Sequence, residues 1–324
     1  MNNARFPLNA LLLVLLFTVG SASAADAKTR VVVAQTFQSL LYLPLYVAMN
    51  AGFFDKQGLD VVKQTAGKPQ VAVAALISGS AQFSVHGPEH AAIAASKGAA
   101  VEVVANVVNR AAAWILAQPD FGYKGLESLK GQKIVVTAPP ATSNSVFIKL
   151  LRENGIDPAK DVGLIPAANG NEVGILLAGQ ARVAVMSEPG VDQAVSRGMK
   201  VIGEFSKFYG PYAYSSVATT KAESPEVIQK FVNAMELAIR YLRTNPAGAV
   251  AIAQKEFPAL EPTVVEAAVR RMIAEGVYPH SAAISPEAFA TAMKVQGYLG
   301  YLKQSPAYAA VINPVFAEKA AAIE

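Results

Sequence analysis

The stretch LPLYVAMNAGFFDKQGLDV, residues 43–61, decides the fold. Aliphatic side chains at helical spacing around an early proline predict a helix over Leu43–Ala51, because proline is tolerated in the first helical turn. Gly52 predicts the end of that helix, since glycine readily adopts the left-handed conformation that stops one. Leu59–Gln64 is typical of a strand. The aromatic pair Phe53–Phe54 is expected to fill the core between helix and strand, so the stretch describes packing.

The same alternation of strands and helices continues to about residue 220, which is typical of βαβ units and an α/β fold with mostly parallel sheets. The expected strands are Arg30–Gln35, Leu59–Gln64, Ala81–Val85, Val101–Val108, Lys133–Val136, Val162–Pro166 and Arg182–Val185. The expected helices are Leu43–Ala51, Pro69–Ile77, Glu89–Lys97, Ser143–Glu153, Glu172–Leu177 and Val191–Ser196. Beyond residue 220 the strand pattern stops. Three or four helices are expected there, opened by the cap-and-proline pairs Ser224-Pro225, Asn245-Pro246 and Ser285-Pro286.

The N-terminus has the pattern of an export signal. Arg5 precedes the apolar run Ala10–Val19, and the small residues Ala22-Ser23-Ala24 follow it. The run is too short to cross a bilayer, which needs about 20 apolar residues. We therefore expect a signal peptide over residues 1–24, cleavage near Ala24, location in the periplasm and no stable membrane insertion.

Composition narrows the class of protein. The chain has no cysteine, so we expect neither a lipid-anchored cysteine nor disulfide bonds. Its formal net charge is +4, and Lys and Arg do not form a stripe interleaved with aromatic residues. Nucleic acid is therefore not an expected partner.

An ordered series of motifs carries a family resemblance. The series consists of the segments 43–48, 51–61, 75–83, 129–136 and 177–184, followed by Glu188-Pro189. With this series the chain resembles the nitrate/sulfonate/taurine family of ABC-importer substrate-binding proteins, to which thiamine-precursor binders are similar. Gln82 departs from the family pattern, which commonly has Asp there.

The resemblance implies a two-lobed periplasmic binding protein fold, type II-like, with a helical C-terminal extension. Lobe 1 is expected to comprise residues 25–117 and 218–324, and lobe 2 residues 118–217, with a hinge where the chain crosses between them. The implied function is capture of a small polar nutrient of the sulfonate, nitrate or taurine class by hinge closure. The implied partners are an ABC permease and ATPase, and we expect a monomer that performs no catalysis and needs no cofactor.

Other functions stay open at this point. A binder of a thiamine-precursor pyrimidine or an aromatic acid fits the same family resemblance. A ligand-sensing module would bind the same solute but signal to a partner kinase, and a secreted zinc hydrolase would show turnover. The sequence does not choose among the solutes.

Candidate ligand contacts follow from the rule that small molecules bind beyond the carboxyl ends of strands in open α/β sheets. The first lobe offers Gln35, Phe37, Gln38, Tyr42, His86 and Glu89, and the second offers Thr142, Ser143, Asn144 and Glu188. The hydroxyls and amide at 142–144 stand at a helix start, where backbone N–H groups favour an anion. Each has a structural alternative, since such residues also cap helices, and Tyr42 can simply pack in the core. Trp114 has two open roles, as a stacking wall for a ligand or as a core residue.

His86-Gly87-Pro88-Glu89-His90 spells H-x-x-E-H, which resembles an inverted zinc-peptidase motif. That motif requires both histidines on one helix. Here a strand runs into Gly-Pro, so His86 is expected to precede the helix and the two histidines to diverge. We therefore interpret the motif as a coincidence.

Overall fold

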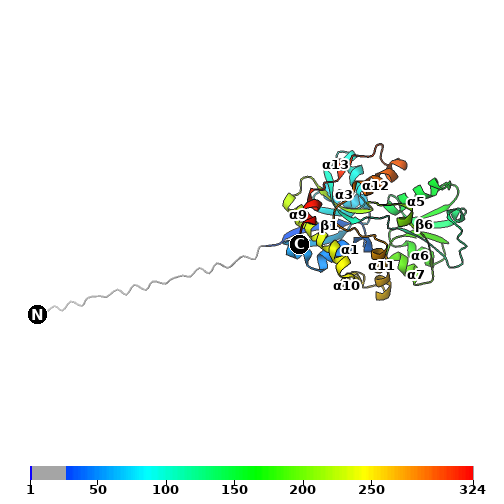
Figure 1. Ribbon diagram of the computed structural model, residues 1–324, viewed down its shortest axis with the longest axis horizontal. Coiled ribbons are helices and arrows are strands. Elements are labelled where there is room, and N and C mark those ends of the chain that lie inside the picture. The colour runs from blue at the N-terminus through cyan, green and yellow to red at the C-terminus, as the bar shows by residue number, and fades with distance from the viewer. Residues whose placement is uncertain (2–26, 324) are drawn as a thin grey trace.

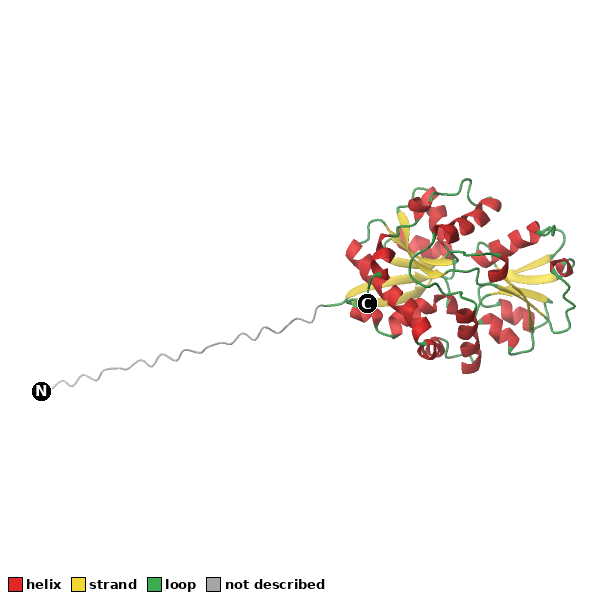
Figure 2. Cartoon of the chain, viewed as in Figure 1, coloured by secondary structure: helices red, strands yellow, loops and turns green. Residues whose placement is uncertain are grey.

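The computed structural model describes Met1 and residues 27–323 of the chain. The expected signal peptide, residues 1–24, falls almost wholly outside the described residues. Two five-stranded sheets lie side by side with helices on their faces (Figure 1), and the helices surround both sheets (Figure 2). The α/β class and the two-sheet architecture that the sequence predicts are confirmed.

The first sheet has the strand order β2-β1-β3-β10-β4. Its strands are β1 (Thr29–Gln35), β2 (Leu59–Thr65), β3 (Phe83–His86), β4 (Val101–Val108) and β10 (Ser215–Thr220). β1 pairs parallel with β2 and β3, whereas β10 runs antiparallel between β3 and β4. The sheet is therefore mostly parallel, with β10 as its one reversed strand.

The second sheet repeats this arrangement with the order β7-β6-β8-β5-β9. Its strands are β5 (Trp114–Ala117), β6 (Lys133–Thr137), β7 (Gly163–Ala167), β8 (Val183–Met186) and β9 (Lys200–Glu204). β6 pairs parallel with β7 and β8, and β5 runs antiparallel between β8 and β9. In each sheet the reversed strand is thus the first strand after the chain has passed over from the other sheet.

These pairings shift the expected lobe boundaries. The chain passes to the second sheet between β4 and β5, through residues 109–113, and returns between β9 and β10. The boundaries expected at 117/118 and 217/218 follow β5 and divide β10, so each lies a few residues too far along the chain. The cause is that β5 and β10 gain their places by pairing with distant strands, which local sequence does not reveal. The hinge itself stays a prediction.

The helices that flank the sheets before β10 are η1 (Leu40–Tyr42), α1 (Leu43–Asn50), α2 (Phe53–Lys56), α3 (Pro69–Ile77), α4 (Pro88–Ser96), η2 (Leu126–Leu129), α5 (Thr142–Glu153), α6 (Glu172–Leu177), α7 (Gly190–Val195) and α8 (Phe205–Phe208). Six of these helices begin within one residue of the expected positions, and the four short ones (η1, α2, η2 and α8) are not predicted by the sequence. After β10 come α9 (Pro225–Thr244), α10 (Pro246–Glu256), α11 (Pro262–Ala274), α12 (Pro286–Tyr298), α13 (Tyr308–Val311) and α14 (Val315–Ala321). The described residues after β10 thus form more helices than the three or four expected.

Residues 43–61 pack in the core as the sequence predicts, and α9 of the C-terminal helices packs against them. Gly52 has a φ of +75° and turns the chain from α1 into α2. The Phe54 ring lies 4.8 Å from that of Phe231 on α9, and Phe231 stacks on Phe83 of β3 at 3.9 Å. The helical extension is therefore part of the core of the first sheet.

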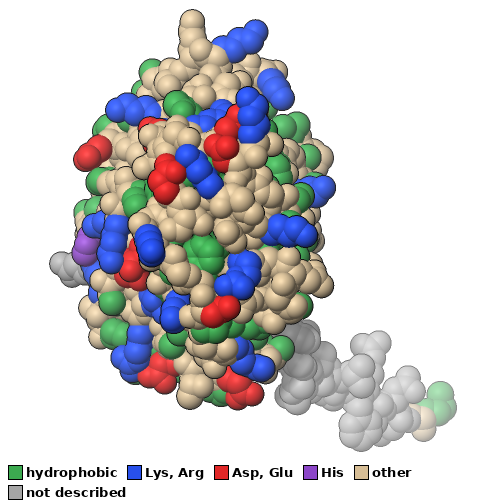
Figure 3. Space-filling view, turned by 90° about the vertical axis from the view of Figure 1, so that its right-hand side faces the viewer, with side chains coloured by type: hydrophobic (Ala, Val, Ile, Leu, Met, Phe, Trp, Pro, Cys, Tyr) green, Lys and Arg blue, Asp and Glu red, His purple; other side chains and the backbone are tan. Residues whose placement is uncertain are grey.

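Charged side chains of both signs lie on the face at the second-sheet end, where Lys and Arg side chains are spread among Asp and Glu (Figure 3). In the part of the chain that the structure describes, no helix combines the length and apolar character needed to cross a bilayer.

Candidate functional site

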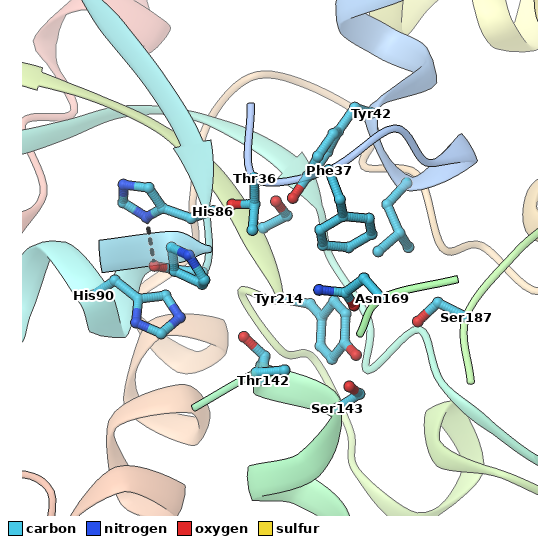
Figure 4. A pocket seen from close by; sticks show the side chains of 15 residues that line it. Thr36, Phe37, Tyr42, His86, His90, Thr142, Ser143, Asn169, Ser187 and Tyr214 are labelled. Atoms are coloured by element: carbon cyan, nitrogen blue, oxygen red, sulfur yellow. Dashed lines mark hydrogen bonds between the residues drawn. The ribbon is translucent and has the colours of Figure 1, made fainter. Parts of the chain in front are cut away.

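A small cavity of about 40 Å³ lies where loops from both sheets meet. Its walls come from the ends of β1, β3, β7 and β8, the starts of α3, α5 and β10, and the loops beside them (Figure 4). The lining residues are Thr36, Phe37, Leu41, Tyr42, Pro69, His86, Gly87, His90, Ala141, Thr142, Ser143, Asn169, Ser187, Tyr214 and Ser215. We call this space the central cavity. Its position beyond the strand ends is where the α/β architecture places ligands.

Five of the ten predicted contacts lie on the wall of the central cavity. They are Phe37, Tyr42, His86, Thr142 and Ser143. Figure 4 shows Phe37, Tyr42, Thr142 and Ser143 around one space, with the His86 ring turned to the side. The first three come from the first sheet and the last two from the start of α5 in the second. The structure therefore brings together side chains that are far apart in the sequence.

Gln35, Gln38 and Asn144 do not line the central cavity. The Gln35 amide donates to Gln38 and Thr65 and its oxygen accepts from the Tyr46 hydroxyl, all within the first sheet and its helices. The Asn144 amide donates to the backbone of Thr137 at 3.1 Å, which ties α5 to β6. Their role as ligand contacts stays a prediction. In this structure hydrogen bonds inside their own lobes orient the Gln35 and Asn144 side chains away from the central cavity.

Glu188 tethers the second sheet to the C-terminal helices. Its Oε2 accepts from the Asp192 backbone N–H at 3.1 Å, and its Oε1 lies 3.0 Å from Nε of Arg271 on α11. Arg271 also reaches Asp192 at 2.7 Å. Burial and the Asp192 carboxylate raise the pKa of Glu188, against the attraction of the Arg271 charge. Glu188 and Gln38 line a neighbouring space of about 90 Å³ rather than the central cavity.

Glu89 holds the two halves together beside the cavity. The Thr142 hydroxyl donates to Glu89 Oε1 at 2.5 Å, across the boundary between the two sheets. The carboxyl folds back over Gly87, where a Cβ atom would lie 2.3 Å from Oε2. Burial raises the pKa of Glu89 to about 7, although the Thr142 hydrogen bond opposes this shift. This carboxyl is therefore much easier to protonate than an exposed glutamate.

His86 lines the central cavity, and both of its ring nitrogens bond to protein. Its Nδ1 lies 2.9 Å from the Gly87 carbonyl oxygen, which can only accept, so Nδ1 carries the proton. Its Nε2 then accepts from the Ser84 hydroxyl at 2.8 Å. Burial lowers the pKa of His86 to about 3, so the ring is neutral.

His90 lines the central cavity although it is not among the predicted ligand contacts. Its ring stands edge-on to that of His86 with 5.7 Å between centroids, so the expectation that the two histidines diverge is wrong. The expectation that His86 precedes the helix is confirmed, because it ends β3. Burial lowers the pKa of His90 to about 4, and its Nε2 has no hydrogen-bond partner among the described residues. With its Nε2 lone pair engaged by Ser84, His86 is not poised to bind a metal.

The cavity offers neutral donors rather than cationic side chains. Among the described residues that line it, none is Lys or Arg. Burial raises the pKa values of Tyr42 and Tyr214, so both phenols stay protonated and able to donate. No side chain of the described residues caps α5, whose first turn opens on the cavity. Backbone N–H groups at such a helix start favour an anion or a partly negative oxygen.

Trp114 lies outside the cavity wall. It is buried in β5, and its indole N–H donates to Glu275 at the end of α11 at 3.1 Å. Of the two roles that the sequence left open, stacking wall or core, the structure shows the core role. Asn169 and Tyr214 do line the cavity, as do Thr36, Ser187 and Ser215. Their common signal in the sequence is a polar side chain directly beside a strand end.

Comparison with known proteins identifies the relatives of this fold. A model of the family described as NMT1/THI5 like matches residues 41–249. A protein of Bacillus subtilis (strain 168), named a candidate binding protein, YtlA, is 23% identical over 313 residues that cover 94% of each chain. A solved structure from Bordetella bronchiseptica RB50 superposes with a TM-score of 0.76 at 25% identity, over 91% of this chain and 97% of that one.

Two further structures share the fold at lower identity. The alkanesulfonate-binding protein SsuA from Xanthomonas axonopodis pv. citri, bound to MOPS, has a TM-score of 0.69 at 17% identity, over 92% of this chain and 99% of that one. The desulfurization enzyme DSZB has a TM-score of 0.67 at 11% identity, over 91% and 99%. The same architecture thus serves both binding and catalysis, so the site has to decide between them.

Proposed function

We propose, from the premise that this chain belongs to the NMT1/THI5-like family, that it is the solute-binding subunit of an ABC importer. The observation that carries the proposal is the central cavity, whose walls come from both sheets and carry polar side chains from each. The chain is exported to the periplasm, acts as a monomer, and hands its solute to a permease driven by an ATPase. No chemical step takes place on it.

Closure of the two lobes follows from contacts that bridge them. The Ser39 hydroxyl donates to the Glu188 carbonyl at 2.8 Å, and the Thr142 hydroxyl donates to Glu89. A solute that touches Tyr42 in one lobe and Ser143 in the other adds further bridging contacts. It lowers the free energy of the closed form because it interacts with that form more than with the open one.

The favoured solute is a small anion of the sulfonate, nitrate or taurine class. A cavity of about 40 Å³ holds on the order of three waters, which suits a compact head group. The start of α5 and the phenols of Tyr42 and Tyr214 supply donors to its oxygens. A raised pKa lets Glu89 be protonated, which removes the repulsion that an ionised carboxylate would exert on an anion.

A pyrimidine or aromatic acid is the second candidate, because the cavity combines neutral donors with ring faces. Phe37 and Tyr42 contact each other with 5.4 Å between ring centroids, and the Tyr214 ring also faces the space (Figure 4). The free faces of such rings are surfaces on which a flat heterocycle can stack.

A thermal-shift screen with nitrate, taurine, alkanesulfonates, aromatic acids and pyrimidines tests the proposal, since a ligand that binds the folded state raises its stability. Ser143→Ala is expected to weaken the best ligand by about tenfold or more through loss of one hydrogen bond. Ser196→Ala, at an exposed serine of the second lobe, is the matched control. Equal affinities in both variants would show that the solute binds elsewhere, and turnover of the ligand would replace the binding function with an enzymatic one.

A further inference from the structure

A second, larger cavity lies beside the first. Its volume is about 530 Å³, and its floor is apolar, with Val73 and Ile77 from α3 facing Ile93 and Ala94 from α4. Tyr301, after α12, stands at its edge and is half exposed. We call this space the outer chamber. Exposed apolar surface gathered in a concave site is typical of ligand binding.

The outer chamber and the central cavity share one thin wall. Pro69 lines the central cavity and Gln70 the outer chamber, and likewise Ala141 lines the first and Pro140 the second. His90 lines both. In two chain segments, neighbouring residues therefore line different spaces, one the central cavity and the other the outer chamber. At His90 a single side chain separates the two spaces.

Unpartnered polar atoms mark this wall. His90 is 7% exposed and Gln296 is 2% exposed, and the Nε2 atom of each lacks a hydrogen-bond partner among the described residues. Buried polar atoms are normally paired, by protein, water or ligand. The Nε2 atom of His90 lies 3.6 Å from Glu89 Oε1, beyond hydrogen-bond distance. His90 and Gln296 both line the outer chamber, although the two Nε2 atoms are buried behind its surface, so only a molecule that displaces the wall beside His90 would reach them.

We infer that the solute is elongated, with a polar head in the central cavity and an apolar tail that passes His90 into the outer chamber. The inference rests on the proposed function, because the head is the group bound there. The central cavity has room for about three waters, so a longer molecule must extend beyond it. His90 is the positioning residue at the junction, and once the wall beside it is displaced, Gln296 supplies a donor to an oxygen near the start of the tail.

The test is a series of straight-chain sulfonates from ethanesulfonate to octanesulfonate, with dissociation constants measured by titration calorimetry on the full mature chain. Each methylene that enters the outer chamber is expected to tighten binding by about threefold to fourfold, as burial of a methylene from water does. Ala74→Phe fills the chamber from an exposed position on α3. This variant is expected to bind ethanesulfonate as the parent chain does and to lose the gain with length.

Ala247→Phe is the matched control, because Ala247 is an exposed alanine on α10 and does not line the chamber. It should keep the full gain with length. A flat series in the parent chain, or a gain that survives in Ala74→Phe, would overturn the two-chamber inference while ethanesulfonate binding kept the proposed function intact. Failure of every sulfonate to bind, ethanesulfonate included, would overturn the favoured ligand class and this inference with it.

Discussion

Protonation of Glu89 should control how tightly the protein holds its solute. In the closed form burial raises the pKa of Glu89 from 4.5 to about 7, whereas an open form that exposes the carboxyl to water restores the lower value. The closed form therefore binds the proton more tightly. The stabilisation of the closed form by this proton is fully present below the pKa that Glu89 has in the open form, and it is lost as the pH rises through about 7. Between pH 8 and pH 6 this linkage alone strengthens closure, and with it affinity, by about tenfold.

The assay is the ratio of the dissociation constants of Glu89→Gln and the parent chain, measured by calorimetry at several pH values. Glutamine keeps a partner for the Thr142 hydroxyl but does not titrate, so the ratio should change by about tenfold between pH 8 and pH 6. His86 and His90 lie beside Glu89 with lowered pKa values and favour an open form when they become protonated. Taking the ratio cancels that opposite contribution, because both chains carry the histidines.

The chain supplies a matched control inside one lobe. The Thr137 hydroxyl donates to Glu172 Oε1 at 2.5 Å, the same type of pair as Thr142 and Glu89, but both residues belong to the second lobe. Burial raises the pKa of Glu172 as well. Glu172→Gln should leave the pH dependence of affinity unchanged. A ratio for Glu89→Gln that is constant across pH would refute the reasoning.

Two predictions concern the C-terminal helices. Arg271→Ala should lower the free energy of unfolding by about 1–3 kcal/mol in urea titrations, because it leaves two buried carboxylates without their cation. The control Arg270→Ala removes only an exposed ion pair and should lower the free energy of unfolding by about 0.5 kcal/mol or less. Equal losses in the two variants would contradict a tethering role for Arg271. Phe231→Ala should cost about 3–5 kcal/mol, because the ring stacks on Phe83 in the core, and Phe208→Ala at a half-exposed position should cost far less. A small effect of Phe231→Ala would show that the extension is not part of the core.

Local chemistry explains why the helix boundaries could be predicted. α3 spans Pro69–Ile77 as expected, and α9, α10 and α12 begin at the prolines that follow Ser224, Asn245 and Ser285, whose side chains cap them. α11 was not among the helices that the capping pattern predicts, since Glu261 precedes its proline and makes no cap. The omission mattered, because α11 carries Arg271.

The wall of the central cavity could be predicted only in part, for a physical reason. Topology places the loops at the strand ends around the cavity, and five of the ten predicted side chains line it, while their binding of a ligand stays a prediction. The direction of the others depends on distant partners. Asn144 turns to Thr137, and Glu89 turns to Thr142. His90 was missed because a histidine one turn into a helix has no local sign that a cavity lies beside it.

Glu188 and Glu89, the two acidic residues among the predicted ligand contacts, differ in their effect on an anion. Glu188 is paired with Arg271 and lines a different space, so its charge is compensated away from the solute. Glu89 is close to the cavity but titrates near neutrality, and an anion bound beside it would raise its pKa further and draw in a proton. Because linkage is reciprocal, that proton in turn strengthens binding of the anion, so the affinity for an anion should depend on pH more steeply than the affinity for a neutral pyrimidine. A carboxyl that titrates near neutrality therefore does not exclude an anionic solute from this cavity.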